Sequence, residues 1–203
     1  MIPGARLVLL GRQGAGKGTQ CVRLSRHYVI PHISTGDMLR SAVKEGTEFG
    51  LKAKEIMDRG ELVSDEIMGG VVDERLTSDD THNRGYILDG FPRTVAQAEA
   101  LDKLLAAQGI RLDAVVELKV DEGALLKRIE TRIAEMTARG ETVRADDNPE
   151  ALKKRLDAYR SQTAPLSAYY KAKGSLLEID GMVPIPEVEK AIDAGLKARK
   201  AAV

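Results

Sequence analysis

The chain has 203 residues, 43% hydrophobic and 31% charged, which is the composition of a globular protein that folds in water. Its 31 basic and 31 acidic side chains cancel, so it lacks the basic excess typical of nucleic-acid-binding proteins. Cys21 is the single cysteine, which excludes an intrachain disulfide and a zinc site built from several cysteines. The first apolar run is too short for a signal peptide or a membrane span, so we expect a cytoplasmic protein with no membrane association.

Five apolar runs bounded by chain-breaking or polar residues predict β-strands. In chain order they cover 5–10, 31–34, 86–89, 114–120 and 176–180. Their apolar residues are continuous rather than alternating, as in parallel strands covered on both faces. Helical patterns occupy 16–28, several short pieces across 37–79, and then 95–108, 122–138, 149–172 and 186–200. This alternation predicts an α/β fold, a single domain over 1–203 with a parallel five-stranded sheet and helices on both faces.

Two stretches interrupt the alternation of strands and helices. Residues 34–63 carry helical patterns with no strand between them, and residues 132–147 are highly charged and break at Gly140. The carboxyl ends of parallel strands meet at one edge of the sheet, where ligands bind in folds of this class. We interpret both stretches as insertions above that edge and not as separate domains.

The stretch "GRQGAGKGTQ" at 11–20 nearly matches the phosphate-binding loop pattern G-x-x-x-x-G-K-S/T, but Gly18 stands where the pattern has a hydroxyl. It joins a predicted strand to a predicted helix, so its backbone N–H groups and the helix N-terminus can converge on an anion. Lys17 can reach the outer phosphates. The alternative is a glycine-rich turn without a ligand; the strand, the helix and the Gly-Lys pair together favour phosphate binding.

A second predicted strand, "YILD", ends on Asp89, beside the expected position of this loop. An acidic residue there suits Mg²⁺, bound directly or through water, and the alternative is a capping or turn aspartate. The histidines His27, His32 and His82 have no evident carboxylate partner and are expected to be structural or solvent-facing. The absence of an acid–base set fits phosphoryl transfer, in which positioning and charge stabilisation dominate catalysis.

Six segments, taken in chain order, resemble the adenylate kinase family of nucleoside monophosphate kinases. They are "GAGKGTQ", "ISTGDMLR", "GELVSDE", "GYILDGFPRTVAQAEAL", "VRADDNPEALKKRL" and "IDGMVP". The resemblance implies a P-loop fold with an AMP-binding insertion at 34–63 and a short lid at 132–147 without zinc. It also implies the Mg²⁺-dependent reaction ATP + AMP ⇌ 2 ADP. In this family a Gly-Lys-Gly-Thr ending is normal, so Gly18 is no defect. Nothing demands a partner chain, and we expect a monomer that binds nucleotides.

The resemblance also implies which residues form the site. Those expected to bind ATP are Gly14, Ala15, Gly16, Lys17, Gly18, Thr19, Arg128, Arg132 and the backbone around Val183. Those expected to bind AMP are Thr35, Arg40, the backbone of Glu61, Leu62 and Val63, then Gly90, Phe91, Pro92, Arg93, Gln97, Arg144 and Arg155. The catalytic set is Lys17, Arg93, Arg128, Arg132, Arg144 and Arg155, and Asp89 is expected to hold Mg²⁺ through water.

Several of these assignments have alternatives. Thr35 could instead cap the helix that begins at "GDMLR", and Gln97 could complete a capping box with Thr94. Arg132 could form a surface pair with Glu135. For the whole protein, the alternatives are a UMP or CMP kinase of the same fold and a nucleotide-binding protein without turnover. Thr35 and Gln97 favour adenine.

Two short segments raise separate questions. The family has proline at the position of Gln13, and the neighbouring Arg12 could either approach the phosphates or project into solvent. Gly69 and Gly70 lie inside the helical pattern "DEIMGGVVDERL". They either weaken that helix, since an interior glycine is unfavourable by about 0.8–1.0 kcal/mol relative to alanine, or they allow close packing.

Overall fold

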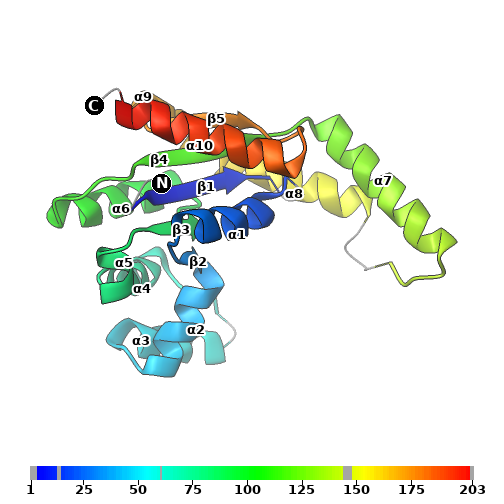
Figure 1. The fold of residues 1–203 in the computed structure, drawn as a ribbon. Coiled ribbons are helices and arrows are strands. Elements are labelled where there is room, and N and C mark those ends of the chain that lie inside the picture. The colour runs from blue at the N-terminus through cyan, green and yellow to red at the C-terminus, as the bar shows by residue number, and fades with distance from the viewer. Residues whose placement is uncertain (1–3, 13–14, 60, 144–147, 202–203) are drawn as a thin grey trace.

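The computed structural model contains one five-stranded sheet surrounded by helices (Figure 1). It describes residues 4–12, 15–59, 61–143 and 148–201, apart from three side chains in the helix at 149–162. The strands are β1 (Arg6–Gly11), β2 (His32–Ser34), β3 (Tyr86–Asp89), β4 (Ala114–Lys119) and β5 (Leu176–Asp180). The helices are α1 (Lys17–Tyr28), α2 (Thr35–Glu45), α3 (Glu48–Asp58), α4 (Asp65–Leu76), α5 (Asp79–His82), α6 (Val95–Ala107), α7 (Glu122–Ala138), α8 (Pro149–Gln162), α9 (Ala164–Ala172) and α10 (Ile185–Ala201).

The sheet has the order β2-β3-β1-β4-β5, and each neighbouring pair of strands is parallel. The predicted α/β fold is therefore confirmed, and each strand begins and ends within one residue of its predicted range. Because all five strands point the same way, their carboxyl ends share one edge. The phosphate loop after β1 and Asp89 at the end of β3 meet at that edge.

The helices cover both faces of the sheet, as predicted. In β1, Leu7 and Leu9 point to the face that α1 and α10 cover, while Val8 and Leu10 point to the face that α4, α6 and α9 cover. All four side chains are at most 4% exposed. Burial on both faces explains the continuous apolar run that marked this strand in the sequence.

One predicted helix is two helices in the structure. The pattern over 149–172 breaks at Thr163, whose N–H still bonds to the carbonyl of Tyr159 and so completes α8. Pro165 then lies in the first turn of α9, where its missing N–H is tolerated. The hydrophobic periodicity predicted one helix here, whereas the structure has two, separated just before this proline.

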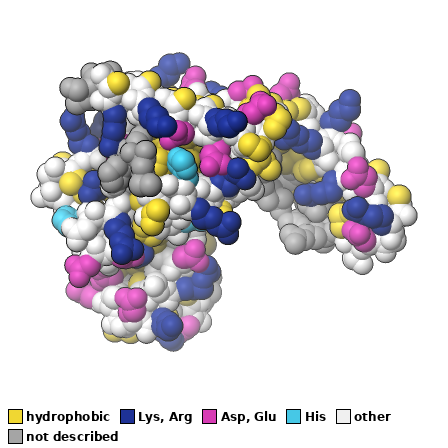
Figure 2. Space-filling view, in the orientation of Figure 1, with side chains coloured by type: hydrophobic (Ala, Val, Ile, Leu, Met, Phe, Trp, Pro, Cys, Tyr) yellow, Lys and Arg dark blue, Asp and Glu magenta, His cyan; other side chains and the backbone are white. Residues whose placement is uncertain are grey.

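The lobe formed by α2 and α3 and the arm formed by α7 and α8 both project from the sheet (Figure 1). The arm has a small core of its own, made by Leu125, Leu152 and Leu156. Figure 2 shows the surface hollowed between the lobe and the arm. Among the described residues, no helix combines the length and the apolarity needed to cross a membrane.

The packing of α3 on α4 resolves the question about the two glycines. A Cβ atom added at Gly70 would lie 2.3 Å from the ring of Phe49, whereas one added at Gly69 would meet nothing within 4 Å. Gly70 therefore allows close packing of the lobe on α4. Gly69 has no such role.

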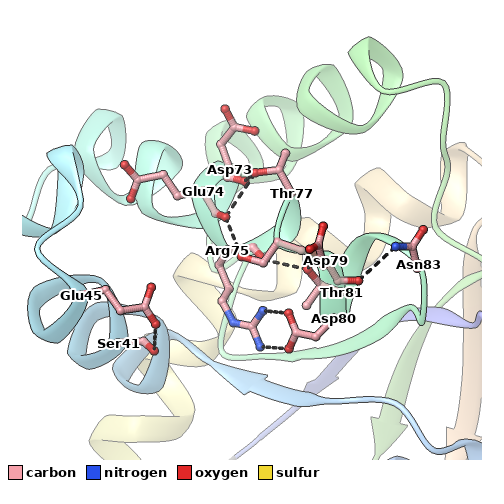
Figure 3. A network of polar contacts seen from close by, with 11 residues as sticks. Ser41, Glu45, Asp73, Glu74, Arg75, Thr77, Asp79, Asp80, Thr81 and Asn83 are labelled. Atoms are coloured by element: carbon pink, nitrogen blue, oxygen red, sulfur yellow. Dashed lines mark hydrogen bonds and ion pairs between the residues drawn. The ribbon is translucent and has the colours of Figure 1, made fainter.

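The connection from α4 through α5 is held by a polar network (Figure 3). The guanidinium of Arg75 donates two hydrogen bonds to Asp80, at 2.8 and 2.9 Å. The hydroxyl of Thr81, which is fully buried, donates to the carbonyl oxygen of Arg75 at 2.8 Å. The helix α5 was not predicted, because a segment of four residues is too short to show a helical periodicity.

Candidate active site

The phosphate loop leads from β1 into an uncapped helix. Gly16, the N-cap of α1, has φ of 84°, a left-handed conformation that glycine adopts without strain. It has no side chain to cap the helix, and the first turn of α1 holds no acidic residue, so the helix start favours an anion. A Cβ atom at Gly18 would meet nothing within 4 Å, which leaves the backbone accessible there. Gln13 and Gly14 lie outside the described residues.

The other predicted loop residues differ in exposure. Ala15 is buried, and its N–H donates to the carbonyl oxygen of Arg12 at 3.0 Å. Thr19 is exposed in the first turn of α1. These positions are compatible with phosphate contacts from the backbone of Ala15 and from the hydroxyl of Thr19.

Asp89 is contacted from two sides. The ammonium Nζ of Lys17 lies 2.5 Å from its Oδ1, and the imidazole Nε2 of His32 lies 3.0 Å from its Oδ2. The expectation that the histidines lack carboxylate partners is therefore wrong for His32, and His27 also lies 3.5 Å from Asp193. His32 begins β2, which pairs with β3, but it is 57 residues from Asp89 along the chain. Such long-range strand pairing is invisible to local pattern analysis.

The environment of Asp89 keeps its carboxyl group ionised. Burial alone would raise its pKa, but hydrogen bonds from His32 and Lys17, together with the charge of Lys17, lower the pKa to about 2. Among the described helices, Asp89 is not an N-cap residue, and Thr94 caps α6, the helix that follows it. A permanent negative charge thus lies beside the phosphate loop.

Gly90 joins two residues that the resemblance assigns to AMP. Its carbonyl oxygen accepts a hydrogen bond from Thr35 Oγ1 at 3.0 Å and another from Arg93 Nε at 2.8 Å. Its φ of 85° requires glycine. The N-cap of α2 is Ser34, whose hydroxyl accepts from the N–H of Asp37, so the alternative that Thr35 caps this helix is wrong.

Phe91 and Pro92 are buried, and the peptide bond between them is cis. They hold the backbone from which the exposed side chain of Arg93 projects. Gln97, in the first turn of α6, accepts a hydrogen bond from the N–H of Arg93 at 2.8 Å and donates one to Asp65 at 2.8 Å. Its side chain therefore does not bond to the N–H of Thr94, as a capping box requires, although Thr94 does cap α6.

The remaining residues that the resemblance assigns to AMP differ in exposure. Arg40 forms an ion pair with Asp37 on the surface of α2. Glu61 is exposed and Leu62 is 96% exposed, while Val63 packs against the core. The structure leaves these positions accessible but brings none of their side chains into contact with Lys17.

The lid arginines are only partly described. Arg128 and Arg132 are exposed on α7, four residues apart, so they share one side of the arm. Arg144 lies outside the described residues. Arg155 belongs to α8, but its side chain is among those the structure does not describe. Val183 is half-buried in the turn between β5 and α10 and packs against the core.

Arg12 neither extends along the loop nor projects into solvent. It forms an ion pair with Glu122, the first residue of α7, and lies over the ring of Tyr159 in α8. Glu122 also accepts two hydrogen bonds from Arg160, one of them 2.9 Å long from Nε. No sequence motif indicated this cluster.

Comparison with known proteins agrees with this geometry. The family model described as "Adenylate kinase" matches residues 9–175, which include both the phosphate loop and Asp89. The chain belongs to the adenylate kinase family. This membership makes it an enzyme, a phosphotransferase that binds nucleotides.

Similar curated proteins cover nearly the whole chain. An adenylate kinase of Azorhizobium caulinodans is 59% identical over 192 residues, which are 95% of this chain and 98% of the relative. One of Beijerinckia indica is 60% identical over 193 residues, 95% of this chain and 100% of the relative. One of Brucella ovis is 56% identical over 188 residues, 93% of this chain and 96% of the relative.

Proposed function

We propose that this enzyme catalyses the reversible reaction ATP + AMP ⇌ 2 ADP. The observation that carries the proposal is the meeting of the two predicted half-sites at one edge of the sheet. Lys17 of the donor loop contacts Asp89, and the next residue, Gly90, holds Thr35 and Arg93 of the acceptor site. Two nucleotides bound to these half-sites would present their phosphates to each other.

In this proposal the donor site holds ATP by its phosphates. Lys17 and the backbone of 14–19 bind the phosphates, and Thr19 adds its hydroxyl. Arg128 and Arg132 reach the triphosphate from the arm, and the backbone around Val183 borders the adenine. Fixed positive charge around the transferring group stabilises the charge that develops in the transition state.

The acceptor site would hold AMP by its phosphate and its base. Arg40 and Arg93 bind the phosphate, with Arg144 and Arg155 completing the contacts to the transferring group. Thr35, Gln97 and the backbone of 61–63 border the adenine, and the segment from Gly90 to Pro92 supports them. For Gln97 this requires that its amide exchange the bond to Asp65 for one to the base.

Asp89 suits Mg²⁺ bound through water. Its carboxylate stays ionised, and both of its oxygens already have protein partners, so a hydrated ion fits better than direct coordination. The ion, when bound, neutralises charge on the transferring phosphate oxygens. We assign no zinc to the lid, because the chain has no cysteine in 132–147.

Residues 34–63 and 132–147 would act as the two moving parts around this edge. Their closure would exclude water, which otherwise competes with AMP as phosphoryl acceptor. We further propose that the enzyme works in the cytoplasm as a monomer, with nucleotides as its partners. The balanced charge of the chain favours nucleotides over nucleic acid as partners.

The test is an assay for ADP formed from MgATP with AMP, CMP, UMP or GMP as acceptor. We expect AMP to give the highest kcat/KM. A preference for CMP or UMP would support the pyrimidine kinase instead. ATP binding without ADP formation from any acceptor would support a nucleotide-binding protein without turnover.

A further inference from the structure

Behind the phosphate loop, three side chains that bind metals in other proteins lie close together. The Sγ atom of Cys21, a ring nitrogen of His32 and a carboxylate oxygen of Asp89 all lie within 4.8 Å of one another. The three come from different elements, namely α1, β2 and β3. Sulfur, nitrogen and oxygen ligands therefore converge from separate parts of the fold.

The elements that carry these ligands are packed against one another. Cys21 is fully buried between α1 and the sheet, and the side chains of His32 and Asp89 are 25% and 15% exposed. β2 and β3 are paired in the sheet, and α1 packs on β3. Ligands on packed helices and strands hold their spacing more closely than ligands on loops. The site is shielded on the thiol side and open on the imidazole and carboxylate side.

The ligand types select the kind of ion. Thiolate and imidazole suit Zn²⁺ and the softer Cd²⁺, whereas Mg²⁺ and Ca²⁺ require oxygen ligands. Three protein ligands with one position left for water is a usual arrangement for zinc outside purely structural sites. We propose that Cys21, His32 and Asp89 form a reversible binding site for a Zn²⁺-type divalent cation. This site differs from the hydrated Mg²⁺ site on Asp89 and from any lid zinc.

The spacing requires only a small adjustment. Zinc bonds of about 2.0–2.3 Å in a tetrahedron place ligand atoms roughly 3.3–3.8 Å apart. The present separation of His32 Nε2 from Asp89 Oδ2 is 3.0 Å, and the other pairs lie within 4.8 Å. Changes of roughly an ångström, within the reach of side-chain rotation, are therefore enough.

Ion binding changes the protonation of the ligands. The S–H bond of Cys21 breaks, its proton passes to solvent and a sulfur–metal bond forms, with no change in oxidation state. Burial and the neighbouring Asp89 raise the pKa of the thiol, so proton release opposes binding. His32 contributes the lone pair of its ring nitrogen. One thiolate and one carboxylate then balance the charge of the dication.

The ammonium group of Lys17 lowers the affinity of the site for a cation but does not prevent binding. Its ammonium contacts Oδ1 of Asp89, while His32 faces Oδ2, so an ion on Oδ2 leaves Oδ1 to the lysine. An ion there takes up the carboxylate to which we assign hydrated Mg²⁺. The expected consequence is inhibition by Zn²⁺, with an affinity that rises with pH because binding releases a proton.

The direct test is titration of the nucleotide-free enzyme with Cd²⁺, followed by the ultraviolet charge-transfer band of a cadmium–thiolate bond. We expect the band to saturate at one equivalent. Cys21→Ala removes the single thiol and must abolish the band whatever the other ligands of the ion are. The informative variant is therefore His32→Gln. It removes one of the three ligands and should weaken binding by roughly tenfold or more. Circular dichroism must show that the variants and the loaded enzyme stay folded.

The matched control is His27→Gln. His27 lies on α1 like Cys21 but faces Asp193, at 3.5 Å, and should leave the titration unchanged. A wild-type affinity for His32→Gln, or an equal loss with His27→Gln, would overturn the proposal. So would a folded enzyme that gives no band.

A second measurement separates this site from the kinase proposal. Zn²⁺ is expected to inhibit the wild-type enzyme at saturating MgATP and to inhibit Cys21→Ala at least tenfold less, because the variant lacks the sulfur ligand. Cd²⁺ binding in an enzyme without kinase activity would keep the metal site and reject the kinase. Full kinase activity without Cd²⁺ binding would keep the kinase proposal and reject the metal site.

Discussion

Arg12 of the phosphate loop is paired with Glu122, the residue that begins α7, and this links the loop directly to the base of the arm. Arg160 holds the same carboxylate from α8. One glutamate thus connects the nucleotide-binding loop with both helices that flank the proposed lid. The residue next to Gln13, the position where the family has proline, thus makes a structural contact outside the loop.

Arg12→Ala should lower the free energy of unfolding by about 1 kcal/mol or less, because the pair is partly exposed and Glu122 keeps Arg160. Since the guanidinium points to Glu122, ATP affinity should change by less than about threefold. Denaturant unfolding and titration calorimetry measure the two quantities. A double-mutant cycle with Glu122→Gln isolates the pair energy, and Arg160→Ala is the control without a loop contact. A large loss of ATP affinity would place the cation on the phosphates.

Gly69 and Gly70 form a matched pair within α4. Gly69→Ala should raise the free energy of unfolding by about 0.8–1.0 kcal/mol, because the new methyl group meets nothing and the helix gains propensity. Gly70→Ala should lower it by about 1–3 kcal/mol, because its methyl group overlaps the ring of Phe49. Denaturant unfolding of both variants is the measurement. Equal shifts of the same sign would show that packing does not distinguish the two positions.

Mutation can distinguish the proposed role of Thr35 in base selection from the role of Ser34 as the cap of α2. Thr35→Ala removes the hydrogen bond to Gly90 and should narrow the ratio of kcat/KM between AMP and the pyrimidine monophosphates. Ser34→Ala removes the cap of α2 and should lower stability by about 0.5–2 kcal/mol without changing that ratio. Steady-state kinetics and thermal unfolding check both. An unchanged ratio in Thr35→Ala would remove this residue from base selection.

Lys17→Met and Arg93→Ala should each lower kcat by orders of magnitude, and Arg93→Ala should change the thermal unfolding temperature little. Both side chains are proposed to act on the transferring phosphoryl group, and Arg93 is exposed. Initial rates at saturating ATP and AMP provide the measurement. The exposed Arg26, at the far end of α1, supplies a control as Arg26→Ala. Normal turnover of AMP by Arg93→Ala would contradict the acceptor-site assignment.

The lowered pKa of Asp193 predicts that part of the free energy of unfolding is lost at acidic pH. Hydrogen bonds from Lys197 and Tyr28 lower its pKa from 3.8 to about 2. A lowered pKa stabilises the fold above pH 3.8, and this contribution disappears as the pH falls from 3.8 toward 2. Asp193→Asn should destabilise by on the order of 1 kcal/mol at neutral pH, since solvent screens the half-exposed Lys197, and the deficit should shrink near pH 3.

Denaturant unfolding at both pH values measures this difference. Asp58→Asn removes an exposed pair with Lys54 and serves as the control. A deficit that stays constant between the two pH values would show that Asp193 acts by packing and not by its charge.

The strands, most helices and the phosphate loop were predictable because each is encoded in consecutive residues. The apolar run of β1, the Asn148 cap with Pro149 after it, and the Asp121 cap of α7 are local signals. The contacts that shape the site are not local. His32 meets Asp89 through strand order, and Arg12 meets Glu122 across 110 residues. Only the sheet topology brings such residues together.

The apolar packing of α7 is concentrated near its base, where Leu125 is buried and Leu126 and Ile129 are partly buried against the core of the arm. Leu125 is its one buried side chain among those the structure describes, and it lies in the first turn beside Glu122. Ala138 ends the helix 13 residues beyond Leu125, so at about 1.5 Å per residue the far end lies roughly 20 Å from that residue. A tilt of about 10° at the base therefore moves the far end by about 3.5 Å. Any change of tilt at Glu122, the residue that contacts the phosphate loop through Arg12, would therefore move Ala138 farther than any other residue of the helix.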